Sequence, residues 1–176
     1  MKEQLISEET LKAYQERYVE MQKHKDTKRG DELFLSTATA ISEQIENMHV
    51  KAKIGDFEIE NDGPQDLGGK GEIIGPVPML LAALANCLEI SALLYLSFSN
   101  LNVNSLKVKV EATQDKRGVL EPNKPPFPGF YDLRYTWIID SKEDPQKLEK
   151  ALREVSAICP ANRTLRQETT ERFEYL

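Results

Sequence analysis

The feature that most constrains this chain is a long apolar run from Met79 to Phe98, in which nearly every side chain is apolar or small. Pro76 and Pro78 come just before it, and proline suits the first turn of a helix because its missing N–H has no partner there. Alanine and leucine dominate the run, and both are strong helix formers. A helix that is apolar on all sides must be buried on all sides. The run therefore predicts the central helix of a core, with Cys87 in its middle.

A membrane-spanning helix is the alternative interpretation of this run. Its length is close to the roughly 20 apolar residues that a bilayer crossing needs. Against that interpretation, Asn86, Glu89 and several serines lie inside the run, and no cluster of Lys or Arg flanks it. We therefore expect the core helix of a globular domain and no membrane as a partner.

Size and charge exclude several classes of protein. The chain has 176 residues, which suits one domain, and its formal net charge of −6 argues against nucleic acid as a partner. Met1 to Leu5 form no apolar signal segment, so we expect a cytoplasmic protein. His24 and His49 show no zinc spacing, and Gly68 to Gly71 is interpreted as a flexible turn rather than a phosphate-binding loop. We therefore expect no metal and no other cofactor.

The first 30 residues predict a helix. Ser7 can cap its start, and Gly30 follows a basic stretch and is expected to end it. An apolar stripe at helical spacing comprises Leu11, Tyr14, Tyr18 and Met21. A helix with this pattern either lies across the body of the protein or contacts a second copy.

A first group of antiparallel strands is predicted after this helix. It has a strand from Leu33 to Ile41, a polar turn around Glu43 to Asn47, and an alternating stretch from Met48 to Glu60. Gly55-Asp56 interrupts the alternation as a bulge or a second turn. The alternation puts two sets of side chains on opposite faces, namely His49, Lys51 and Lys53 against Val50, Ala52 and Ile54.

A second group of strands follows the apolar run. Alternation predicts one strand from Asn102 to Gln114, and another strand is predicted from Phe130 to Asp140. Pro122 to Gly129 holds four prolines, too many for a strand ladder, so it is expected to be an exposed crossing.

The last part of the chain predicts a helix. Asp144 is its N-cap and Pro145 its first residue. Its expected buried stripe comprises Leu148, Leu152, Val155 and Ile158. Pro160 ends the helix, a new helical turn is expected over Asn162 to Arg166, and Thr169 to Leu176 is expected to form a closing strand. Antiparallel strands mixed with helices in this order indicate an α+β fold.

Two cysteines are the candidate reactive groups. Cys87 lies inside the apolar helix, and Cys159 lies just before Pro160, 72 residues further along the chain. In a reducing compartment such a pair is free thiols or a working redox pair rather than a structural crosslink. A buried cysteine is also a common small core residue, so core filling is the alternative. Cys159 stands at a predicted helix start, which lowers the pKa of a thiol.

The motifs around the two cysteines resemble those of the OsmC/Ohr family, the osmotically inducible protein C and organic hydroperoxide resistance proteins. The matching segments are Gly75-Pro-Val-Pro-Met-Leu-Leu-Ala-Ala-Leu-Ala-Asn-Cys87 and Cys159-Pro-Ala-Asn-Arg-Thr-Leu165. The Asp62-Gly-Pro stretch is similar to the OsmC-like branch. The resemblance implies an OsmC-like domain over residues 31–176, with residues 1–30 as a helical extension. It also implies an intertwined homodimer in which antiparallel sheets wrap two central helices, with sites at the subunit interface.

The resemblance further implies a peroxidase. Cys87 would match the thiol that attacks an organic hydroperoxide, and Cys159 the thiol that resolves the sulfenic acid as a disulfide. A lipoyl-type dithiol would then restore both thiols. Neither a metal nor a flavin takes part in this chemistry.

The chain departs from the peroxidase branches at two positions. Val77 stands where those branches carry a Glu, and no Arg occurs between Gly30 and Lys116 to hold the thiolate. The cations that remain in the opening strands and the following loop are His49, Lys51, Lys53 and Lys70. Glu89 is interpreted as the partner of a buried or interfacial cation.

These departures leave two other functions open. One is an OsmC-like protein that binds a small molecule or senses redox state without peroxidase activity. The other is an interaction module whose N-terminal helix docks a partner.

Overall fold

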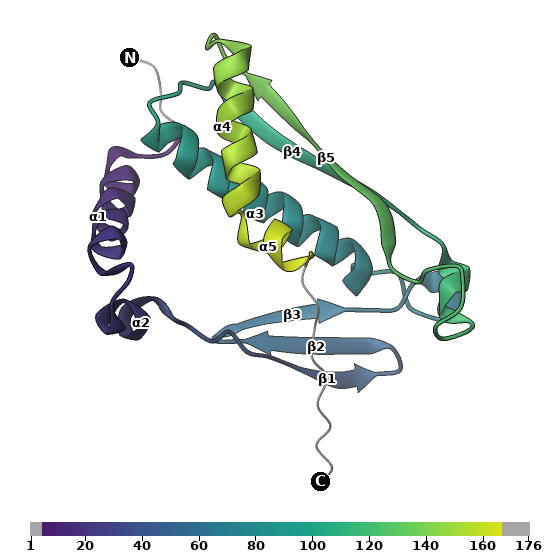
Figure 1. Cartoon of the computed structure of the whole chain (residues 1–176). Coiled ribbons are helices and arrows are strands. Elements are labelled where there is room, and N and C mark those ends of the chain that lie inside the picture. The colour runs from purple at the N-terminus through teal and green to yellow at the C-terminus, as the bar shows by residue number, and fades with distance from the viewer. Residues whose placement is uncertain (1–4, 167–176) are drawn as a thin grey trace. The chain divides into compact units, whose positions relative to one another are not determined.

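The computed structural model describes residues 5–166 (Figure 1). It has the α+β composition that the sequence predicts, with two antiparallel sheets and helices. The chain divides into two compact units, one of Lys12–Ala82 and one of Met1–Leu11 with Ala83–Leu176. The closing strand predicted for Thr169 to Leu176 lies outside the described residues.

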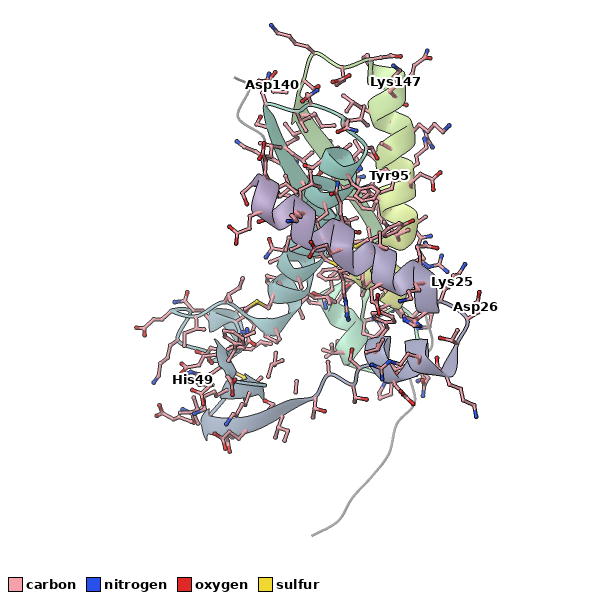
Figure 2. The ribbon with its side chains drawn as sticks, turned by 90° about the vertical axis from the view of Figure 1, so that its left-hand side faces the viewer. Lys25, Asp26, His49, Tyr95, Asp140 and Lys147 are labelled. Carbon is pink, nitrogen blue, oxygen red and sulfur yellow. The ribbon has the colours of Figure 1, made fainter. Side chains whose placement is uncertain are left out.

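Two helices, rather than the one predicted, form the N-terminal segment. They are α1 (Glu8–His24) and α2 (Lys28–Phe34), and Lys25 and Asp26 lie at the corner between them (Figure 2). Thr27 caps α2 by accepting a hydrogen bond from the N–H of Gly30. The prediction that Gly30 ends a helix was therefore wrong. A Cβ at this position would lie 2.0 Å from the carbonyl oxygen of His24, so close contact at the corner explains the glycine.

A three-stranded antiparallel sheet follows. Its strands, in spatial order, are β1 (Ala40–Glu46), β2 (His49–Ile54) and β3 (Phe57–Asn61). The predicted strand from Leu33 was wrong, because α2 continues through Phe34, whose ring lies under the Arg17 guanidinium at 4.4 Å. The predicted turn over Glu43 to Asn47 was also wrong. Only Asn47 of that stretch is in the turn, where its φ of 51° reverses the chain.

The two faces of this sheet have different chemistry, as the alternation predicted. Lys51 pairs with Glu43 on β1 at 3.6 Å and with Glu58 on β3 at 3.4 Å. His49, labelled in Figure 2, pairs with Glu60 at 3.0 Å. The opposite face is apolar and includes Ala52, Ile54, Phe57 and Ile59. None of the residues in these three strands is buried.

The loop before the central helix is held by Asp62, whose side chain is buried. Its carboxylate accepts hydrogen bonds from the N–H groups of Gly63 and Lys70, both at 2.7 Å. The short helix η1 (Gln65–Leu67) lies within this loop. The backbone N–H of Lys70 is therefore already occupied, which fits a structural turn rather than a phosphate-binding loop.

The central helix α3 (Pro76–Phe98) begins and ends where the apolar run predicts. Its buried residues form one stripe, Leu84, Leu88, Ala92 and Leu96. Among residues 5–166, α3 is not buried on all sides, since Ile90 is 59% exposed and Leu80 45% exposed. By length and composition α3 is the one helix of residues 5–166 that could cross a bilayer.

The β4–β5 ladder and two further helices complete the second unit. The elements are β4 (Ser105–Gln114), η2 (Lys116–Val119), β5 (Phe130–Asp140), α4 (Pro145–Ile158) and α5 (Pro160–Thr164). Asp144 caps α4 as predicted, accepting from the N–H of Gln146.

A core joins α3, α4 and the β4–β5 ladder (Figure 1). Its buried members include Leu96, Leu106, Leu152 and Val155, and Tyr95 packs against them on the side of α4 (Figure 2). The predicted inward position of Ile158 was wrong, because that residue is 55% exposed. After Val155, the next buried residue is Cys159, four positions further along the chain, and not Ile158.

Candidate functional site

The structure brings the two cysteines together. Cys87 lies on α3, and Cys159 lies at the break between α4 and α5. Both are free thiols, and the Cys159 thiol donates a hydrogen bond to the Cys87 sulfur with the two Sγ atoms 3.4 Å apart. Two sulfurs in van der Waals contact need only a small movement to bond. The sequence-predicted pair therefore meets within one unit of the chain.

Apolar side chains surround the two sulfurs. Cys159 is fully buried with Leu84 and Leu88. The residues that pack around this buried group are Cys87, Val108, Val110, Tyr135, Trp137 and Ala161. The rings of Tyr135 and Trp137 meet edge to face with their centroids 6.0 Å apart. The site is thus an apolar enclosure built from α3, β4, β5 and α5.

Burial controls the protonation of Cys159. Desolvation raises the pKa of this thiol, and the neighbouring Cys87 raises it further. Hydrogen bonds from the backbone N–H groups of Asn162 and Ala161 act in the opposite direction, but they are outweighed. The prediction that a helix start lowers the pKa of Cys159 was therefore wrong in its net sign. Cys159 is a protonated thiol at neutral pH.

The cations suggested as substitutes for the family Arg are mostly engaged with carboxylates of their own unit. Lys51 has two Glu partners, His49 has Glu60, and the ammonium of Lys70 lies 2.8 Å from Glu46. No positively charged side chain is among the causes of the Cys159 pKa shift. Glu89 is half-buried on α3 and makes no ion pair with any residue that the structure describes.

One residue of this site, Asn162, is not predicted from the sequence, where it is only part of a motif and of a new helical turn. Its side chain is 6% exposed and donates to the carbonyl oxygen of Ser156 at 2.7 Å, beside the Cys159 turn. A polar residue with a side-chain donor two positions after Pro160 was the available signal, since proline removes a helical donor.

Over residues 5–166, no group of three or more His, Cys, Asp or Glu side chains is placed to hold a metal ion.

The fold and the site define a class: an α+β protein in which a cysteine on a long apolar helix meets a buried Cys-Pro cysteine. The family model described as OsmC-like protein matches residues 69–173, more than half of the chain. The chain therefore belongs to the OsmC-like protein family, and the resemblance noted in the sequence is confirmed. A comparison with curated proteins found no match.

Solved structures share the fold. An OsmC-like protein from Mycoplasma pneumoniae is 24% identical over 74% of this chain and 87% of its own, with a TM-score of 0.62. An organic hydroperoxide resistance protein from Legionella pneumophila is 20% identical over 75% of this chain and 90% of its own, with a TM-score of 0.55. An organic hydroperoxide resistance protein from Elizabethkingia anophelis is 18% identical over 76% of this chain and 91% of its own, with a TM-score of 0.55. At these identities the likeness establishes the fold, as the sequence predicted.

Proposed function

We propose that this protein is a thiol-dependent peroxidase that reduces organic hydroperoxides in the cytoplasm, with Cys87 and Cys159 as its catalytic residues. The observation that carries the proposal is the 3.4 Å contact between the two sulfurs inside an apolar enclosure. The names of two structural relatives, both organic hydroperoxide resistance proteins, agree with this substrate class.

The reaction balances with these two thiols. The Cys87 thiolate attacks one oxygen of the O–O bond, which breaks, and the alkoxide takes a proton and leaves as an alcohol. Cys87 is then a sulfenic acid. The Cys159 sulfur attacks it, forms a disulfide and releases water. A dithiol of the lipoyl type reduces the disulfide by exchange and is itself oxidised to its cyclic disulfide.

Burial supports this assignment of roles. Cys87 is half-buried, so a substrate can approach it, whereas Cys159 is fully buried. Burial also raises the pKa of Cys159, which keeps it protonated and less reactive toward peroxide. The side chains packed around the two sulfurs, including Leu84, Leu88 and Val110, are apolar, which agrees with a substrate that carries an alkyl group.

A homodimer is part of the proposal. The uncovered side of α3 carries exposed Leu80 and Ile90, and an apolar helix face of this kind favours a protein partner. A second copy would cover it in the intertwined arrangement. We also propose that residues 1–30 are an extension and residues 31–176 the OsmC-like domain, with α2 crossing that boundary.

The test is the intact mass of the reduced protein after one equivalent of an alkyl hydroperoxide. We expect rapid loss of two hydrogens in the parent. Cys159→Ser should gain one oxygen at Cys87, while Cys87→Ser should stay unchanged on the same time scale. No reaction in the parent, with both thiols still open to alkylation after unfolding, would reject the peroxidase and favour a small-molecule-binding or redox-sensing protein of the same fold.

A further inference from the structure

Asn162 and Asp62 are the two buried polar residues in the part of the chain that the structure describes. Asp62 closes a loop, but Asn162 sits beside the cysteine pair, three residues after Cys159. Its side chain donates to the carbonyl oxygen of Ser156 at 2.7 Å. A carbonyl only accepts, so this bond uses the NH₂ group of the amide. Buried polar groups are satisfied in native proteins, and this bond satisfies two of them at once.

Pro160 explains why the bond is needed. In an α-helix the carbonyl of each residue accepts from the N–H four residues later. The last such bond of α4 runs from the N–H of Cys159 to the carbonyl of Val155, at 2.9 Å. The next would run from residue 160 to Ser156, but proline has no N–H. The side chain of Asn162 supplies the donor that Pro160 lacks.

The backbone of Asn162 also influences Cys159, because its N–H lowers the pKa of that thiol against the larger effect of burial. The N–H of Arg163 donates to the Cys159 carbonyl at 3.0 Å. Cys159 therefore lies in a turn tied to α5 by backbone bonds and to the last turn of α4 by the Asn162 side chain.

Building on the proposed two-cysteine chemistry, we propose that Asn162 is a positioning residue: its bond to Ser156 holds the turn that keeps the Cys159 sulfur against Cys87. Without this bond the Ser156 carbonyl loses its partner and the turn is free to shift. A shifted turn lowers the effective concentration of one thiol at the other, which weakens disulfide formation.

The test measures this effective concentration without any peroxide. The full-length protein is equilibrated with mixtures of reduced and oxidised glutathione, trapped with an alkylating agent and weighed. Cys87 and Cys159 give two electrons and two protons to oxidised glutathione, which becomes two reduced molecules. We expect Asn162→Ala and Asn162→Asp to lower the equilibrium constant for the protein disulfide about tenfold.

Ser156→Ala is the matched control. It removes the hydroxyl bond to the Leu152 carbonyl in the same turn but keeps the carbonyl of residue 156. We expect its disulfide constant to equal that of the parent. If Asn162→Ala does not fold, Asn162→Asp is measured instead, because it keeps the size of the side chain and loses the amide donor. A disulfide constant equal to that of the parent in this variant would contradict the proposal.

A merely structural role gives a different result. Asn162→Ala would then lower the unfolding temperature of the reduced and oxidised forms equally and leave the disulfide constant unchanged, which overturns the positioning role while the proposed function stands. A parent that is oxidised by glutathione but ignores alkyl hydroperoxide rejects the peroxidase and leaves the role of Asn162 intact. A parent that forms no disulfide in either experiment rejects both.

Discussion

The two sheets of this chain are stabilised in different ways. The β4–β5 ladder rests on buried side chains from α3, β4 and α4, among them Leu96, Leu106 and Leu152. The β1–β3 sheet has no buried residue in any of its strands. Its strands are linked instead by backbone bonds and by Lys51, which bridges Glu43 and Glu58.

This difference shows which part of the chain is complete by itself. A small sheet is stable when a hydrophobic face is covered. Helices of its own unit cover the β4–β5 ladder. The apolar face of the β1–β3 sheet is not covered by its own strands, and Phe57 on that face is 76% exposed. The proposed second copy would supply the missing surface. Three substitutions test this contrast.

The largest effect is expected in the covered sheet. Leu152→Ala should lower the free energy of unfolding by about 3 kcal/mol, because it leaves a cavity in a fully packed core. Urea denaturation measures this change. Ile158→Ala, on the exposed side of the same helix, is the control and should stay within about 0.5 kcal/mol of the parent. Equal losses in the two variants would mean that α4 does not bury the stripe described above.

An intermediate effect is expected in the uncovered sheet. Ile59→Ser, on its apolar face, should weaken the proposed dimer about tenfold or more, since burying one isoleucine contributes roughly 1.5–3 kcal/mol. Sedimentation equilibrium measures the dissociation constant. Ile41→Ser changes the same residue type on the charged face, opposite Lys53, and should leave the constant unchanged. Identical dissociation constants for the two variants would show that a second copy does not cover the apolar face.

The smallest effect is expected from the charged bridge. Glu58 and then Glu43 raise the pKa of Lys51 above its ordinary value of 10.5. The stability that this bridge contributes is therefore fully present below pH 10.5 and is lost as the pH rises through the raised pKa. Lys51→Gln should slightly lower the unfolding temperature in low salt and have almost no effect in high salt, where the charges are screened. A loss that persists in high salt would point to packing rather than charge.

The sequence predicted the elements whose signals are local. The apolar run and its two prolines predicted both ends of α3, the stretch from Phe130 to Asp140 predicted β5, and Asp144-Pro145 predicted the start of α4. Each of these depends on residues within the element itself. Composition and spacing were sufficient to predict them.

The errors arose where contacts between two elements decide the structure. Gly30 resembles a helix stop, yet it is glycine because the chain passes close to His24. Phe34 resembles a strand residue, yet it ends a helix beneath Arg17.

The candidate site could be predicted only in part. The motifs identified Cys87 and Cys159, but these residues are 72 positions apart in the chain, and their contact depends on how α3 and α4 pack together. The role of Asn162 depends on the structure of the turn, in which its side chain donates to the Ser156 carbonyl that Pro160 leaves without a backbone donor.

The position of Trp137 in the core around Cys159 has a further consequence. It is the only tryptophan of the chain, and its indole packs against the cluster that holds Cys159 as well as against the main core. Thiols and disulfides quench indole emission to different extents. The intrinsic fluorescence of the unlabelled protein is therefore a built-in optical signal for the state of its sulfurs, and stopped-flow emission can follow their oxidation in real time.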